Sequence, residues 1–192
     1  LAGECIQAGA SLEGGLDGFL SRRSANLRSK WRKSFRRAAD RGVTFERSCP
    51  TDTAGADAVY ARMLAVEQRS WKGVGHCGMT ESPAREFYAD MIRRLAAQGT
   101  ARVMFARHEG QDIGFIFGGM LGPCYRGQQF SYDAAWKDLS IGNLLQVEQI
   151  RSLIKRKVDL LIISANESEP VTPIAIEAYR AGIPTILVDR KI

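Results

Sequence analysis

Three short β-type segments follow one another in the middle of the chain, and this run limits the possible folds more than any other feature. The segments cover residues 102–107, 112–120 and 124–133. Glu109-Gly110 supplies a turn after the first segment, and Leu121-Gly122-Pro123 supplies one after the second. Connections this short join antiparallel neighbours. The sequence therefore predicts an antiparallel meander.

Helices are predicted on both sides of the meander, where apolar residues recur at helical spacing. Before it we expect a helix from residue 24 to a stop at Gly42, a strand at 43–47, helices at 56–72 and 83–97, and a glycine-rich loop at 73–78. After it we expect a loop at 134–141, a helix at 142–155, a buried strand at 158–164, a helix at 173–181 and a strand at 185–189. The last three elements have the order of a parallel βαβ unit. The predicted fold class is α/β, with a mixed sheet that contains the meander, is flanked by helices and ends in this unit.

Positive charge is concentrated near the beginning of the sequence. The 192 residues carry a formal net charge of +6, and residues 22–41 contain nine basic residues against one acid, Asp40. Such a block either binds nucleic acid or another polyanion, or forms the solvated face of a helix. Residues 1–23, rich in glycine and alanine, are expected to be a loosely ordered lead-in.

Cysteine usage and hydropathy indicate the compartment. The four cysteines are scattered and form no CxxC pair, so we expect reduced thiols, a cytoplasmic location and no metal site. No apolar run reaches the roughly 18 residues that a membrane span needs.

The junction between the third meander strand and the next helix is the most informative stretch. Ser131-Tyr132-Asp133 ends the strand, and Ser140-Ile141-Gly142-Asn143-Leu144-Leu145 opens the helix. Free backbone N–H groups at a helix start can bind a phosphate without any side chain, and Gly142 would let the anion come close. The alternative is an ordinary loop that contains a glycine.

The order of these elements resembles the GNAT superfamily of N-acyltransferases, in the branch similar to Fem-type aminoacyltransferases and the acetyltransferases of polysaccharide gene clusters. The resemblance covers roughly residues 24–152. It is carried by residues 27–33, Glu67 with Ser70-Trp71-Lys72, Phe87-Tyr88 with Met91, Ile113-Gly114, and the junction at residues 131–145.

The resemblance implies N-acyl transfer from acetyl-CoA or another acyl-CoA to the amine of a small molecule. It places the pyrophosphate of the donor at Ser140, Ile141, Gly142, Asn143 and Leu144. Fem-type relatives use aminoacyl-tRNA instead, so the acyl carrier stays open. The sequence also departs from the superfamily motif, because Gly142 is the only glycine in this loop.

Two residues within this region are candidates for proton transfer. Glu67 falls on the same helical face as Tyr60, Leu64 and Trp71, and partial burial would suit it to act as a base. Tyr132 lies near the expected acyl group and could donate a proton. The alternatives are a half-exposed glutamate and a packed core tyrosine.

Gly118-Gly119, inside the second meander strand, predicts a β-bulge or the close approach of a ligand. The bulge alone is the simpler interpretation.

Residues 149–192 resemble a different family, the N-terminal lobe of periplasmic sugar-binding proteins and Lac-repressor-like regulators. The resemblance is carried by residues 157–168, 170–173 and 177–190, and it implies that Asn166, Asp189 and Arg190 face a sugar. A chimera of two parents is one hypothesis, and a non-catalytic binding module is the alternative function.

The tail can also be interpreted as the completion of the acyltransferase sheet. In that interpretation residues 158–164 pair beside residues 128–133, and Tyr179 protonates the departing thiolate, as the GNAT resemblance implies.

Overall fold

The computed structural model describes residue 33 and residues 36–122, 124–164 and 168–188. Its centre is a six-stranded sheet in which sequence order and spatial order coincide. The strands are β1 (Thr44–Ser48), β2 (Ala101–His108), β3 (Gln111–Leu121), β4 (Cys124–Tyr132), β5 (Leu160–Ser164) and β6 (Thr185–Val188). The first four strands are antiparallel neighbours, whereas β4, β5 and β6 are parallel. The predicted mixed sheet is therefore confirmed.

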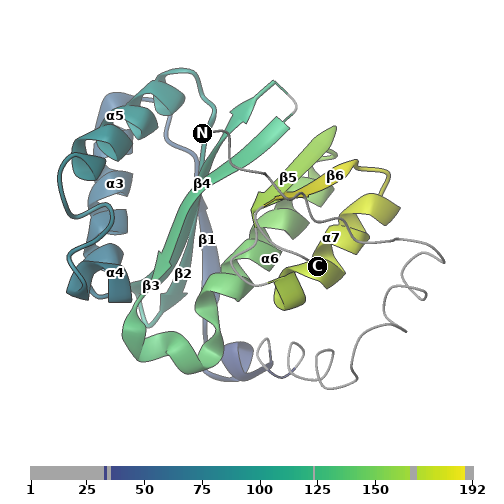
Figure 1. Ribbon diagram of the computed structural model, residues 1–192, viewed down its shortest axis with the longest axis horizontal. Coiled ribbons are helices and arrows are strands. Elements are labelled where there is room, and N and C mark those ends of the chain that lie inside the picture. The colour runs from purple at the N-terminus through teal and green to yellow at the C-terminus, as the bar shows by residue number, and fades with distance from the viewer. Residues whose placement is uncertain (1–32, 34–35, 123, 165–167, 189–192) are drawn as a thin grey trace, which may run out of the picture.

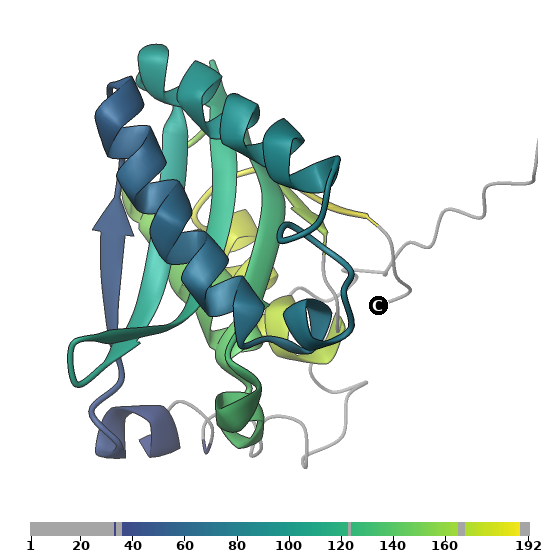
Figure 2. The same cartoon turned by 90° about the vertical axis from the view of Figure 1, so that its left-hand side faces the viewer.

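Helices cover both faces of this sheet. Figure 1 shows α3 (Thr53–Gln68), α4 (Trp71–Val74) and α5 (Ala84–Ala97) on one side, and α6 (Ile141–Lys155) and α7 (Ser168–Arg180) on the other. Figure 2 shows α3 and α5 lying across the sheet. Residues 36–40, just before β1, are also helical and belong to the helix predicted from residue 24.

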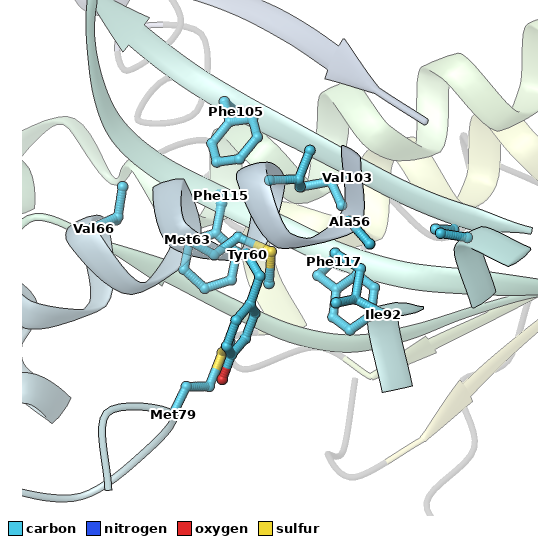
Figure 3. Packing of buried hydrophobic residues seen from close by; sticks show 13 residues of the cluster. Ala56, Tyr60, Met63, Val66, Met79, Ile92, Val103, Phe105, Phe115 and Phe117 are labelled. Atoms are coloured by element: carbon cyan, nitrogen blue, oxygen red, sulfur yellow. The ribbon is translucent and has the colours of Figure 1, made fainter. Parts of the chain in front are cut away.

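The core on the α3 side follows from the alternation of side chains along the strands. Phe105, Phe115 and Phe117 are fully buried, and Met63 of α3 and Ile92 of α5 pack on them. Figure 3 shows these side chains between the helices and the sheet. Successive strand residues point to opposite faces of a sheet. The strand residues adjacent to these phenylalanines, such as Met104, Ala106 and Ile116, therefore face α6.

The core on the α6 side has two parts. Met104, Ala106 and Ile116 pack with residues of the first turns of α6. Further along α6, a second cluster joins this helix to α7, β4 and β5 and is made of Tyr125, Val147, Ile150, Leu153, Val158, Leu161, Ile163, Ile174, Ala175, Ala178 and Ile183. The helix α6 thus links the meander to the last two strands.

The meander and its bulge were predicted well. The observed strands agree with the predicted ranges to within one residue at each end. The register between β3 and β4 shifts at Phe117/Gly118, which confirms the bulge. Gly118 is needed there because a Cβ atom on it would lie 2.4 Å from the Arg126 carbonyl oxygen.

Three predicted boundaries were wrong. The helix predicted at 56–72 ends at Gln68 and a new helix begins at Trp71, because the Ser70 hydroxyl accepts hydrogen bonds from the N–H groups of Lys72 and Gly73. The predicted loop at 134–141 contains a 3₁₀ helix, η1 (Ala134–Leu139), whose first turn is capped by Asp133. The last helix begins at Ser168 instead of residue 173.

The pairing predicted between residues 158–164 and 128–133 was also wrong. The strand β5 pairs with β4 only at Cys124, Tyr125 and Arg126, opposite Leu160–Ile162. After Arg126 the two strands are no longer paired, because β4 bends at the bulge. We call the opening between β4 and β5 beyond this point the fork.

Candidate functional site

The backbone of β4 beside the fork is held by side chains instead of by a neighbouring strand. The Lys72 Nζ atom donates to the Phe130 carbonyl oxygen over 2.9 Å. The Phe130 N–H donates to the Gln129 Oε1 atom over 3.2 Å. Buried backbone groups need such partners, so both polar groups of Phe130 point away from β3 and toward the fork.

Lys72 reaches this edge because α4 begins at the Ser70 cap and points the lysine toward β4. Its Nζ atom also donates to Gln129 Oε1 over 2.8 Å and lies 5.5 Å from the centre of the Phe130 ring. Burial lowers the pKa of Lys72, and the nearby charge of Glu67 opposes this effect. The site therefore holds one ammonium group at the edge of the sheet, with two of its three N–H donors directed at β4.

Glu67 lies behind this lysine and is completely buried. Its Oε1 atom accepts a hydrogen bond from the Met79 N–H over 3.2 Å, whereas its Oε2 atom has no hydrogen-bond partner among the described residues. The chain passes very close at Gly78, where a Cβ atom would lie 2.5 Å from Oε1. Glu67 thus holds the loop after α4 and supplies a negative charge near Lys72.

Ser131 is a further buried polar group on β4. It lies opposite Phe115, whose side chain belongs to the core under α3, and within the part of the chain that the structure describes its hydroxyl has no hydrogen-bond partner. The α3 side of β4 therefore presents polar atoms from Gln129 and Ser131 to the same region as Lys72.

The three predicted catalytic residues lie apart. Glu67 is on the α3 side of the sheet, whereas the Tyr132 ring packs on the α6 side, against the core and beside Gly142. Tyr179 is on α7 and is 57% exposed. The structure does not bring them together at one point.

The predicted phosphate-binding stretch forms the start of α6, at the wide end of the fork. Ile141, Gly142 and Leu144 are buried, so Ser140 and Asn143 are its more exposed members. Gly142 serves packing here, because a Cβ atom on it would lie 2.9 Å from the Phe130 ring.

Sequence reasoning missed Gln129 as a site residue, and it noted Lys72 and Ser131 only as parts of motifs. Asn166, Asp189 and Arg190, the residues of the sugar-binding interpretation, lie outside the described residues. Within the part of the chain that the structure describes, no group of three or more His, Cys, Asp and Glu side chains could hold a metal ion.

A mixed sheet whose parallel strands β4 and β5 separate beyond Arg126, with the start of α6 beside β4, agrees with the fold that the GNAT resemblance implies. The chain belongs to the GNAT family, because the family described as an acetyltransferase (GNAT) domain matches residues 21–166. As a member it is an N-acyltransferase domain that uses an acyl-CoA donor, which confirms the predicted activity and cofactor.

Solved structures of similar proteins include three acetyltransferases. The PaiA N-acetyltransferase of Thermoplasma acidophilum, solved with coenzyme A, is 18% identical over 60% of this chain and 75% of its own, with a TM-score of 0.43. An aminoglycoside acetyltransferase from an uncultured soil metagenomic sample, solved with sisomicin, is 14% identical over 81% and 94%, with a TM-score of 0.49. A GNAT acetyltransferase of Brucella melitensis, solved with acetyl-CoA, is 16% identical over 66% and 79%, with a TM-score of 0.46.

No curated protein matches the chain. None of the helices among the described residues is both long and apolar enough to cross a membrane.

Proposed function

We propose that this domain transfers the acyl group of an acyl-CoA to a primary amine of a small molecule, and that the reaction takes place at the edge of β4 in the fork. The observation that carries the proposal is the pair of hydrogen bonds from the Lys72 ammonium group to Gln129 and Phe130. A half-buried cation at an open strand edge is suited to stabilise a group that develops negative charge.

The acyl-CoA would enter the fork from its wide end. The N-terminus of a 15-residue helix, α6, lies there and carries partial positive charge. Within the stretch from Ser140 to Leu144, the backbone N–H groups of Ser140, Asn143 and Leu144 donate to Lys137 and Ser140 carbonyl oxygens, so the N–H groups of Ile141 and Gly142 would hold the pyrophosphate, beside the half-buried Ser140 and Asn143. The thioester would then lie deeper in the fork, beside Phe130.

Lys72 would stabilise the oxygen of the tetrahedral intermediate. The acceptor nitrogen forms a bond to the thioester carbon, the carbon–sulfur bond breaks, and the proton lost from the nitrogen ends on the departing thiolate. Glu67 is buried behind Lys72, so we assign it a positioning role in which it keeps the lysine charged. Tyr132 and Tyr179 stay predictions as proton donors.

The acceptor would approach past α4, whose outer side is apolar. Trp71 is 62% exposed and Val74 is 73% exposed, and they flank Lys72 on the same short helix. Large apolar side chains left in water often mark a binding surface. An amine attached to a partly apolar small molecule fits this surface.

The other hypotheses stay predictions. They comprise the Fem-type branch, the cytoplasmic location, nucleic-acid binding through residues 22–41, and the spliced, sugar-binding tail. The boundaries 1–23, 24–152 and 149–192 are untested as well, although β5 and β6 pair within the same sheet as the meander.

The experiment compares Lys72→Met with Lys155→Met, the same change at an exposed lysine at the end of α6. Acetyl-CoA binding is measured by calorimetry, and thiol release is measured with a panel of primary amines and amino sugars. We expect Lys72→Met to lower kcat by about 100-fold or more and to leave the Kd of acetyl-CoA within a few-fold. Lys155→Met should behave as wild type. Full turnover by Lys72→Met would overturn the proposed role of the β4 edge.

A further inference from the structure

A small cavity lies where the fork closes, between β4, β5 and α6. Its volume is about 40 Å³. Strands and helix contribute to its walls, which are formed by Ile116, Tyr125, Gly127, Gln146, Gln149, Ile150, Leu161, Ile162 and Ile163. The walls are largely apolar, but three of these residues carry polar atoms into the interior.

The three polar residues of the cavity share one property. Tyr125, Gln146 and Gln149 are 5%, 5% and 3% exposed, and among the described residues neither glutamine Oε1 atom has a hydrogen-bond partner. Burial raises the pKa of Tyr125, and its interaction with the Gln149 side chain opposes this effect, so the phenol stays protonated. A buried acceptor without a partner is unfavourable. Two such acceptors beside the Tyr125 hydroxyl indicate that a hydrogen-bond donor binds in the cavity.

The volume of the cavity is larger than one water molecule requires. A cavity holds one water from roughly 10–15 Å³ upward, so about 40 Å³ accommodates two or three non-hydrogen atoms. That is the size of the end of a short acyl group.

The cavity borders the fork at one residue of its wall. Gly127 lies in its wall and is the first residue of β4 beyond the pairing with β5. A Cβ atom on Gly127 would have only one neighbour within 4 Å, the Tyr125 ring at 3.9 Å. The strand therefore leaves space between the edge that carries Phe130 and the cavity behind it.

We infer that this cavity receives the end of the acyl group and selects acyl groups that carry a neutral hydrogen-bond donor, such as a hydroxyl. The inference rests on the proposed function, since it requires the thioester to lie in the fork. Two amide oxygens accept only, and the tyrosine hydroxyl donates or accepts. A ligand hydroxyl can donate a hydrogen bond to these acceptors. A carboxylate has no proton to donate and would be repelled by the acceptors, and a charged amine would lose its hydration on burial.

The test uses two acyl-CoAs that differ only in one terminal group. Propionyl-CoA ends in a methyl group and hydroxyacetyl-CoA ends in a hydroxyl at the same position. Calorimetry gives their dissociation constants, together with those of acetyl-CoA and malonyl-CoA. One regained hydrogen bond corresponds to about tenfold tighter binding of hydroxyacetyl-CoA than of propionyl-CoA.

A pair of tyrosine variants shows where the preference originates. Tyr125→Phe removes one hydroxyl and keeps the buried ring, so the domain should stay folded. We expect this variant to reduce the tenfold preference to about threefold or less. Tyr88→Phe is the matched control, because it deletes the same atom on α5, and it should keep the full preference.

The outcomes separate this inference from the proposed function. If acetyl-CoA does not bind, the proposed function fails. If acetyl-CoA binds and the two test ligands bind equally, the cavity holds only water and the inference alone is overturned. Tighter binding of malonyl-CoA, or a preference that survives in Tyr125→Phe, would also overturn it.

Discussion

The ion pairs of Arg62 provide a prediction whose size follows from burial. Arg62 donates to both carboxylate oxygens of Asp112 over 2.8 and 2.9 Å and to Glu46 over 2.9 Å. Its guanidinium carbon lies 3.9 Å from the centre of the buried Phe105 ring. Arg93 on α5 also pairs with two carboxylates, Asp57 and Asp90, but its side chain and theirs are 44–66% exposed.

We compare Arg62→Met with Arg93→Met. Charge-assisted hydrogen bonds contribute about 1.5–3 kcal/mol each when shielded. The Arg62 side chain is 33% exposed, and Arg107 still pairs with Glu46 in its absence, so we discount the total to a loss of about 2–3 kcal/mol. For Arg93→Met we expect a much smaller loss, because ion pairs between exposed side chains contribute little to stability.

Thermal melts followed by circular dichroism measure both losses. For a domain of this size Tm falls by about 2–4 °C per kcal/mol, which gives a drop of about 4–12 °C for Arg62→Met. This drop should persist in 0.5 M NaCl, because salt screens shielded pairs weakly. Equal losses in the two variants, or a drop that disappears in salt, would refute the argument from burial.

Two further predictions concern the bulge and the pH dependence. Gly118→Ala should destabilise the domain by about 2 kcal/mol or more, because its Cβ atom would lie 2.4 Å from the Arg126 carbonyl oxygen. Gly127→Ala at the same bulge should change stability by less than about 1 kcal/mol. The midpoints of urea unfolding measure both changes. Burial raises the pKa of Tyr60, whose hydroxyl donates to the Arg85 carbonyl oxygen, to about 12. Between about pH 10 and 12 the unfolded chain therefore releases a proton that the folded chain keeps, and stability falls as pH rises. Tyr60→Phe should flatten that fall, and a Tm series at increasing pH with unchanged slope would contradict this.

The sequence predicts the elements of this fold where one local pattern decides them. The meander is visible because turn residues separate its strands, and Gly118-Gly119 marks the bulge. The break between α3 and α4 was missed because Leu64, Glu67 and Trp71 recur at helical spacing. This spacing indicates one continuous helix, although Ser70 caps a new one. The same kind of local cap, Asp133, was overlooked before η1.

The candidate site depends on contacts that no local pattern contains. Glu67 could be selected because its helical face is apolar. Lys72, in contrast, meets Gln129 and Phe130, which lie 57 and 58 residues further along the chain. Where β5 pairs with β4 likewise depends on the bulge in β4, so it could not be inferred from residues 158–164 alone.

The bulge, the fork and the lysine are connected by one geometric cause. Gly118 pairs with Gly127 and Phe117 pairs with Gln129, so Gln128 is the extra residue of β4. An extra residue bends and twists its strand, and the pairing with β5 stops just before it, at Arg126. The bend leaves the backbone of Phe130, which pairs with Ile116 of β3 on one side, without a strand partner on the side of β5, and an unpaired edge is costly. Lys72 and Gln129 satisfy it with side chains, which can rotate away when a ligand offers equivalent groups. A paired neighbouring strand could not move away in this manner, so side-chain partners leave the edge of β4 available to a ligand.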